Sequence, residues 1–203
     1  MSKIALTPNA SGSGTFTIAS PNSDTDRTLT LPDKAGEIVA GAGSMVDFQS
    51  VTKTDTFSAS VASGASVAVT GLSLTHALKS SSNKLLITAY FGVAAHGAGR
   101  GAIGIAIHNG SNLISIATSP GSRTPVTSGG ALAEASDNSR IVVMPSLSII
   151  AEPGSTSAVT YTVHAINIDN VTETLYVNRS EVDTDASYIP RGVSALHIQE
   201  IAG

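Results

Sequence analysis

The sequence predicts an all-β protein with an extended N-terminal arm that carries short strands, followed by a β-sandwich of jelly-roll-like type. The composition supports this fold class: Gly is abundant at 19 of 203 residues, while only 4% of residues are aromatic and 13% are charged. Small and β-branched residues favour tightly turned β structure over helix bundles. Short alternating segments also recur along the chain between turn-forming residues, and no stretch shows sustained helical periodicity.

The first 44 residues differ from the rest in that their strand-like segments are very short. Thr15–Ser20 ("TFTIAS") and Arg27–Leu31 ("RTLTL") alternate like strands, and Pro32–Gly36 ("PDKAG") forms a predicted turn. Strands this short are not stable alone in water. We therefore expect residues 1–44 to be an anchoring arm that ends in a flexible linker, Ala40–Ser44, and pairs with another chain.

The sandwich is expected over residues 45–203. Its strand candidates alternate in hydrophobicity and are separated by turns rich in Gly, Ser, Asn and Pro. They are Phe48–Thr54, Ser66–Thr70, Lys84–Val93, Ala102–His108, Leu113–Ala117, Ile141–Ile150, Ala158–Ile166, Glu173–Val177 and Val193–Ile201.

Two local features refine this assignment. Asn109-Gly110 predicts a two-residue hairpin turn, because both positions tolerate the positive φ that such a turn needs. Leu74–Ser80 fits either one turn of helix or the end of a strand.

Composition narrows the classes of function. The net charge of −4 and pI near 5.6 offer no basic face for nucleic acid. Cysteine is absent, which excludes disulfides, thiolate nucleophiles and Cys-based metal sites. No apolar run has the length of a membrane-spanning helix, and the N-terminus lacks a signal-peptide core, so neither a membrane partner nor secretion by the usual route is expected.

Several segments match binding-site motifs but lack the flanking structure that those sites need. Gly99–Gly104 matches G-x-G-x-x-G, but the residues after it alternate like a strand, whereas a dinucleotide site needs a helix there. Asn22–Asp33 partly matches a calcium loop but has Arg27 where the sharp turn requires Gly. We expect no enzyme activity and no cofactor, since no serine or carboxylate arrangement of a hydrolase stands out.

The five histidines do not form a local metal motif. None lies two to four residues from another, so a metal cluster would need long-range assembly. A threefold axis could instead gather three copies of one histidine around an ion. His96 is the favoured residue for this, because it lies in a glycine-rich loop.

Two segments resemble phage virion structural proteins of the tail-fibre-like and capsid-decoration (head-fibre) type. The first is "GTFTIASPNSDTDRTLTLPDKAGEIV", which is similar to a front segment found repeatedly in such proteins. The second resembles their C-terminal β domain, through "QSVTKTDTFSAS", "VTGLSLTHALKSSSNKLLITAYFGV", "GSRTPVTSGG" and "YVNRSEVDTDASYIPRGVSALHIQEIAG". Together the two matches cover most of the chain. The chain departs from long fibres of this kind in having no shaft between arm and head.

The resemblance implies a homotrimer without catalytic activity, made in the host cytoplasm and located on the surface of a particle. Its partners would be copies of itself and a major capsid, tail or baseplate protein. The arm would add strands to such a partner through backbone hydrogen bonds. Four apolar side chains would fill pockets and two residues would fix the turn: Leu29, Leu31, Ile38 and Val39, with Pro32 and Gly36.

The sequence is compatible with three functions. The short length and absence of a shaft favour a capsid-decoration protein. A short tail fibre that recognises a host surface glycan or protein is the alternative, and it would use the loops His96–Gly101 and Ser119–Gly130, with His96, Arg100 and Arg123 as contacts. A polysaccharide-degrading spike is favoured least.

The remaining charged residues are assigned to contacts between subunits. Arg179 and Arg191 are expected to pair with Asp183, Asp185 or Glu200 across the trimer interface, in preference to binding a receptor. The neighbouring Asn178 and Gly192 are expected to order loops near that contact.

Overall fold

A computed structural model describes residues 11–15, 17, 19, 22–26, 28, 42–96, 102–119, 121–131 and 142–203. The chain divides into two units, Met1–Ile38 and Val39–Gly203. In the first unit, the described residues include a side-chain contact in which Ser23 Oγ accepts a hydrogen bond from the Thr25 amide at 3.2 Å, and none of them lies in a strand. The proposed anchoring residues Leu29, Leu31, Pro32, Gly36, Ile38 and Val39 lie outside the described residues.

The second unit is built from antiparallel strands, and the described part of the chain contains no helix. The strands are β1 (Met45–Lys53), β2 (Phe57–Val61), β3 (Ser66–His76), β4 (Lys84–Tyr90), β5 (Val93–His96), β6 (Ala102–His108), β7 (Leu113–Ile114), β8 (Ser128–Ala131), β9 (Ser146–Ala151), β10 (Val159–Asn167), β11 (Glu173–Val177) and β12 (Ser194–Ile201).

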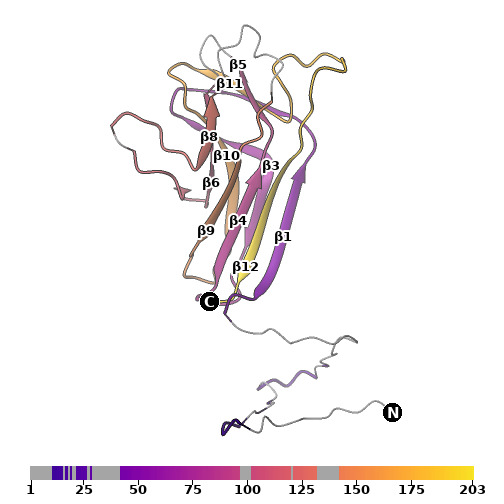
Figure 1. The fold of residues 1–203 in the computed structure, drawn as a ribbon, viewed down its shortest axis with the longest axis vertical. Coiled ribbons are helices and arrows are strands. Elements are labelled where there is room, and N and C mark those ends of the chain that lie inside the picture. The colour runs from indigo at the N-terminus through magenta and orange to yellow at the C-terminus, as the bar shows by residue number, and fades with distance from the viewer. Residues whose placement is uncertain are drawn as a thin grey trace. The chain divides into compact units, whose positions relative to one another are not determined.

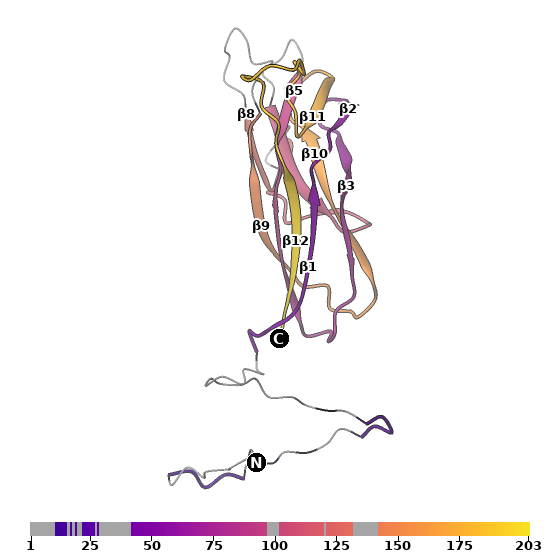
Figure 2. The same ribbon diagram turned by 90° about the vertical axis from the view of Figure 1, so that its right-hand side faces the viewer.

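These strands form three sheets. The first sheet has the order β1-β12-β4-β9, and the second has the order β3-β10-β6-β7, with β8 also paired to β6. A small third sheet, β2-β11-β5, lies at one end. Figure 1 shows the strands of the first sheet side by side, and Figure 2 shows β9, β12 and β1 in one layer with β10 and β3 in the other. The all-β prediction is confirmed, and the antiparallel layers are consistent with a β-sandwich.

The core lies between the layers and follows directly from alternation along the strands. In β4, Leu85, Ile87 and Ala89 are buried, whereas the residues between them face outward. The same period of two buries Leu196 and Ile198 of β12. Facing residues of the second sheet complete one continuous cluster, which includes Val69, Leu72, Ile103, Ile105, Ile107, Tyr161 and Val163.

Most predicted strands are confirmed, two of them (Ala102–His108 and Glu173–Val177) with the predicted bounds. The predicted strand Ile141–Ile150 is shorter, since β9 starts only after Pro145, which has no N–H to give to a sheet. The predicted strand Leu113–Ala117 ends at Ile114, because Ser115 adopts a positive φ of 52°. The strand expected over Lys84–Val93 is two strands that belong to different sheets.

Three further details correct the sequence-based expectations. Residues 57–61 form β2, although they lie outside the strands predicted from the sequence. In this strand Phe57, Ala59 and Val61 alternate with serines. Residues 128–130 belong to β8 and not to a free loop. The segment from Leu74 continues β3 to His76 and is not helical.

The β6–β7 hairpin is confirmed, but its loop has four residues and not two. His108 pairs with Leu113, so residues 109–112 form the connection. Asn109 Oδ1 accepts hydrogen bonds from the amides of Ser111 (3.1 Å) and Asn112 (2.9 Å), and Gly110 has a φ of 86°. The Asn side chain thus closes a wider turn than the two-residue type.

Candidate functional site

The arginines assigned to subunit contacts form ion pairs within one chain. Asp183 lies between them, with its carboxylate 3.4 Å from Arg179 Nη1 and 2.7 Å from Arg191 Nη2. Arg179 also donates to the carbonyls of Ser180 (3.0 Å) and Glu181 (2.8 Å). The guanidinium groups therefore brace the long loop between β11 and β12, and contact with a second subunit stays a prediction.

The other predicted contacts are dispersed. Asp185 and Arg123 are exposed in loops, and Ser119 Oγ donates to the Arg123 carbonyl at 2.6 Å. His96 ends β5, with its side chain outside the described part, and Arg100 lies outside the described residues. Glu200 differs from all of these, because its side chain is fully buried inside the sandwich.

The junction around Asn178 was expected from sequence only as a loop-ordering element. Asn178 is buried with a φ of 61°, and its Nδ2 donates to the carbonyls of Lys53 (2.8 Å) and Asp55 (3.0 Å). Its Oδ1 accepts from Ser194 Oγ at 2.6 Å, and its amide donates to the Gly92 carbonyl. The side chain and backbone of this one residue thereby join the ends of β1, β11 and β12 to the β4–β5 connection.

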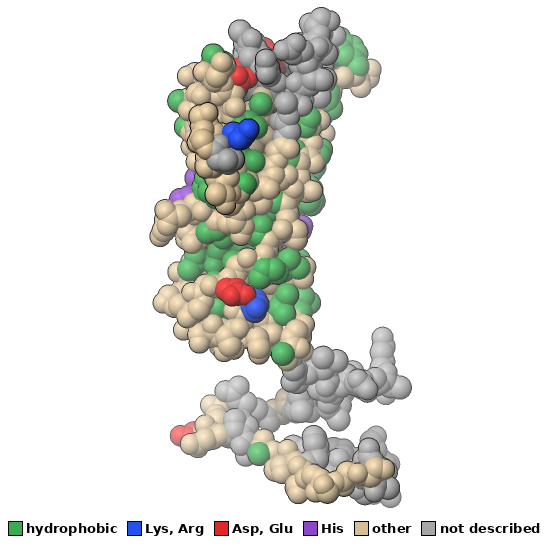
Figure 3. Space-filling model, turned by 60° about the vertical axis from the view of Figure 1, so that its left-hand side comes forward, with side chains coloured by type: hydrophobic (Ala, Val, Ile, Leu, Met, Phe, Trp, Pro, Cys, Tyr) green, Lys and Arg blue, Asp and Glu red, His purple; other side chains and the backbone are tan. Residues whose placement is uncertain are grey.

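The outer face of the first sheet is nearly free of charge. In these four fully described strands, Lys84 is the one charged residue whose side chain faces outward, and it pairs with Glu152 at 2.7 Å. The outward side chains are Val46, Phe48, Ser50, Thr52, Lys84, Leu86, Thr88, Tyr90, Ser146, Ser148, Ile150, His197, Gln199 and Ile201. The side of the molecule drawn in Figure 3 is also mostly hydrophobic and uncharged polar, with few charged groups.

Large apolar side chains are exposed on this same face. Phe48 and Ile150 are each about half exposed, at 50% and 51%, and Tyr90 is 40% exposed. His197 stacks on Phe48, with ring centroids 6.0 Å apart, and contacts Tyr90 at 6.1 Å. Exposed aromatic and aliphatic side chains on an uncharged sheet face are typical of a surface that packs against protein.

A cavity of about 400 Å³ opens between β9 and the β6–β7 hairpin. It combines the Tyr161 ring and apolar side chains with a few polar groups, and burial raises the pKa of Tyr161 above its ordinary value of 10.0. Its lining residues are Asn109, Ser111, Ile114, Ser115, Ile150, Ala151, Glu152, Pro153, Val159 and Tyr161.

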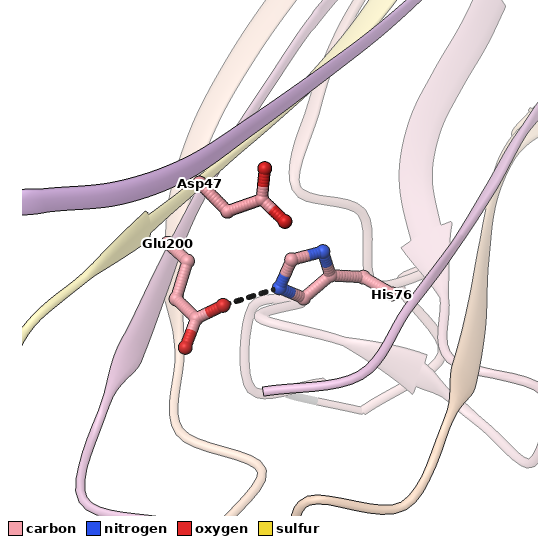
Figure 4. A group of neighbouring side chains, drawn as sticks. All are labelled: Asp47, His76 and Glu200. Atoms are coloured by element: carbon pink, nitrogen blue, oxygen red, sulfur yellow. Dashed lines mark hydrogen bonds and ion pairs between the residues drawn. The ribbon is translucent and has the colours of Figure 1, made fainter. Parts of the chain in front are cut away.

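Three titratable side chains meet at the end of the sandwich where β1 begins and β12 ends. They are Asp47 of β1, His76 of β3 and Glu200 of β12, and their potential ligand atoms all lie within 4.8 Å of one another. Figure 4 shows both carboxylates directed towards the imidazole ring of His76. His76 Nε2 and Glu200 Oε2 are 2.8 Å apart and hydrogen-bonded.

The carboxylate of Glu200 is held from several directions. Its Oε1 accepts hydrogen bonds from the Lys79 amide (2.7 Å) and Asn83 Nδ2 (2.6 Å). Burial would raise the pKa of Glu200, but the hydrogen bonds from Asn83, Lys79 and His76 and the charge of His76 hold it below its ordinary value of 4.5. Glu200 is therefore ionised at neutral pH.

Sequence reasoning missed this cluster, which we call the 47–76–200 cluster. His76 and Glu200 are 124 residues apart, and only the register of Asp47 opposite Glu200 in β1 and β12 brings the two acids together. A weak sign was present in the sequence: Asp47, His76 and Glu200 each occupy an inward position of a strand, where a polar side chain needs a partner.

Comparison of the sequence with known protein families and with curated proteins finds no match to either. In the described part of the chain, no helix is long and apolar enough to span a membrane.

Proposed function

We propose that the protein is a non-enzymatic structural protein of a bacteriophage particle, a homotrimer that decorates the capsid. The N-terminal arm would attach to the particle, and the sandwich would be displayed on its surface. The resemblance of both segments to virion proteins supports this assignment. The interleaved order of the strands in the two larger sheets supports it as well, since that order matches a jelly roll, an architecture used by viral capsid and lectin domains.

The observation that carries the proposal is the uncharged outer face of the first sheet. Near a threefold axis each side chain meets copies of itself from the other subunits, so a charged group there would face its own kind. This face has exposed Phe48, Tyr90 and Ile150 and avoids such repulsion. It therefore suits packing of identical subunits better than a charged receptor or nucleic acid.

Light scattering during size-exclusion chromatography tests the assembly. We expect the full chain to elute with three times its 20.4 kDa mass. Phe48→Asp and Ile150→Asp should shift it to the monomer, whereas Ser73→Asp, at an exposed position of β3 on the other sheet, should not. A trimer that survives both substitutions in the first sheet would exclude this face as the interface.

Imaging of particles labelled with an antibody against residues 45–203 tests the location. Label spread over the head with icosahedral regularity is expected for decoration. Label confined to the tail would instead establish the second candidate, a short tail fibre.

The cavity beside β9 is the observation that favours that second candidate. A tyrosine ring with nearby amide, hydroxyl and carboxylate groups suits the recognition of a sugar. Binding of the protein to host surface glycans, lost on Tyr161→Phe combined with Glu152→Gln, would support a receptor-binding role.

A further inference from the structure

We infer that the 47–76–200 cluster is a binding site for one divalent transition-metal ion, with zinc as the representative ion. This inference does not depend on the proposed function. The three residues come from three strands and two sheets, since Asp47 and Glu200 belong to the first sheet and His76 to the second. A bound ion would therefore bridge the two layers of the sandwich.

The donor atoms lie close to the spacing that such an ion needs. One imidazole nitrogen and two carboxylate oxygens lie within 4.8 Å of one another. An ion with bonds of about 2.1 Å holds its ligand atoms at most about 4.2 Å apart, so a small movement of the partly exposed Asp47 side chain would close the site around it. The side chains of His76 and Glu200 are almost completely buried, at 1% and 0% exposure. Asp47 is 30% exposed and gives the ion a route from solvent.

An unsatisfied nitrogen points to a missing ligand. His76 Nδ1 is buried and has no hydrogen-bond partner among the described residues, whereas Nε2 is bonded to Glu200. Buried polar atoms in native proteins nearly always have a partner. The imidazole is thus only half satisfied, beside a carboxylate, Asp47, that could share a cation with it.

The surroundings of Glu200 resemble the support that metal ligands receive. In metal sites, ligating groups are fixed by a second layer of hydrogen bonds. Here Asn83 and the Lys79 amide fix Glu200 Oε1, and Oε2 remains directed at His76. The cluster is therefore held in place before any ion arrives.

The competing ion pair at Asp47 is weak. Lys79 Nζ lies 3.5 Å from Asp47 Oδ2, but the Lys79 side chain is 61% exposed. Exposed ion pairs contribute little to stability, so the ammonium group can move into solvent when a cation binds.

The donor set selects the class of ion. An imidazole nitrogen suits zinc, copper, iron and nickel, while magnesium and calcium prefer oxygen ligands only. With three protein ligands, the ion would complete its coordination with water. Because the site joins β1, β3 and β12, we expect a structural clamp on the sandwich.

Calorimetric titration of the metal-free full chain with zinc chloride tests the inference. We expect one zinc ion per chain, a higher unfolding temperature with zinc, and much weaker binding of magnesium and calcium. Asp47→Asn and His76→Gln should each weaken zinc binding by at least about tenfold, since loss of even an outer-layer partner costs that much. His197→Gln is the matched control, because His197 lies on β12 but on the outer face of its sheet.

Asp47→Asn is the decisive variant, as this residue is partly exposed and its replacement should leave the fold intact by circular dichroism. Nitrogen-15 NMR of the imidazole groups gives a second readout, in which zinc should shift His76 and leave His197 unchanged. Zinc binding that is absent, is equal for the wild type and Asp47→Asn, or is matched by magnesium would overturn the inference.

Discussion

At the scale of single residues, the side chain of Val126 leaves no room for even one methyl group at Gly104. Gly104 pairs with Gly129 between β6 and β8. A Cβ atom at Gly104 would collide with the side chain of Val126 and lie 3.4 Å from Ile168 Cγ2. Glycine is thus required here by packing and not by backbone conformation.

We expect Gly104→Ala to lower the free energy of unfolding by about 1–3 kcal/mol, the usual cost of overpacking. Val126 is β-branched, so it cannot readily rotate away. Urea unfolding followed by circular dichroism measures the change. Gly14→Ala serves as the control, because a Cβ atom there would have no neighbour within 4 Å.

Glu200 makes stability depend on pH in a definite direction. Its pKa is lower in the folded chain than its ordinary value of 4.5, so the folded state favours the ionised form. The stabilisation is therefore fully present above that ordinary value and is lost as the pH falls through the lower, folded-state pKa.

Replacing Glu200 with Gln should remove this part of the pH dependence. We expect Glu200→Gln to cost about 3 kcal/mol at neutral pH, because His76 loses its buried charged partner. Urea unfolding at a series of pH values should show the wild type approaching the variant as the solution becomes acidic. Glu152→Gln, which alters only the exposed pair with Lys84, should behave like the wild type.

At the scale of elements, the strands are held in place by side-chain hydrogen bonds between their ends as well as by backbone hydrogen bonds along the sheets. The Asn178 side chain connects the end of β1 to the start of β12, and its backbone connects β11 to the β4–β5 segment. Its left-handed conformation is tolerated because Asn accepts positive φ better than most residues. This junction fixes where the third sheet meets the first.

Asn178→Ala should therefore destabilise the sandwich by about 3 kcal/mol, since it leaves buried backbone carbonyls and Ser194 Oγ without a partner. Asn178→Gly relieves the backbone strain and separates that contribution from the hydrogen bonds. Thermal and urea unfolding would contradict this account if the Gly variant were as stable as the wild type. Asn170→Ala, at an exposed position, is the control.

At the scale of the whole molecule, the chain divides into residues 1–38 and 39–203, and we expect the second unit to fold on its own. Among the described residues, the core cluster and the twelve strands all belong to the second unit.

Deleting residues 1–38 should leave the unfolding temperature of the sandwich within about 2 °C of that of the full chain, since core burial is unchanged. The same deletion should abolish attachment to particles if the arm is the anchor. Calorimetry measures the first effect, and decoration of arm-free and full-length protein on stripped particles measures the second. Full decoration by the deletion variant would disprove the anchoring role.

Local patterns in the sequence specify most of the strands of this protein. Alternation with a period of two and turns rich in Gly, Asn and Pro predicted most strands, because side-chain direction and backbone permissiveness are local properties. The predicted strand boundaries were wrong where one residue interrupts a strand, as at Pro145 and Ser115.

Which strands pair, and which distant side chains meet, depends instead on how the whole chain folds. The 47–76–200 cluster exists because β1 pairs with β12 in one register and β3 faces them from the other sheet. Likewise, the intrachain pairing of Arg179 and Arg191 with Asp183 depends on the path of one loop. Such contacts join residues that no short sequence pattern relates, because they arise from burial of one shared core.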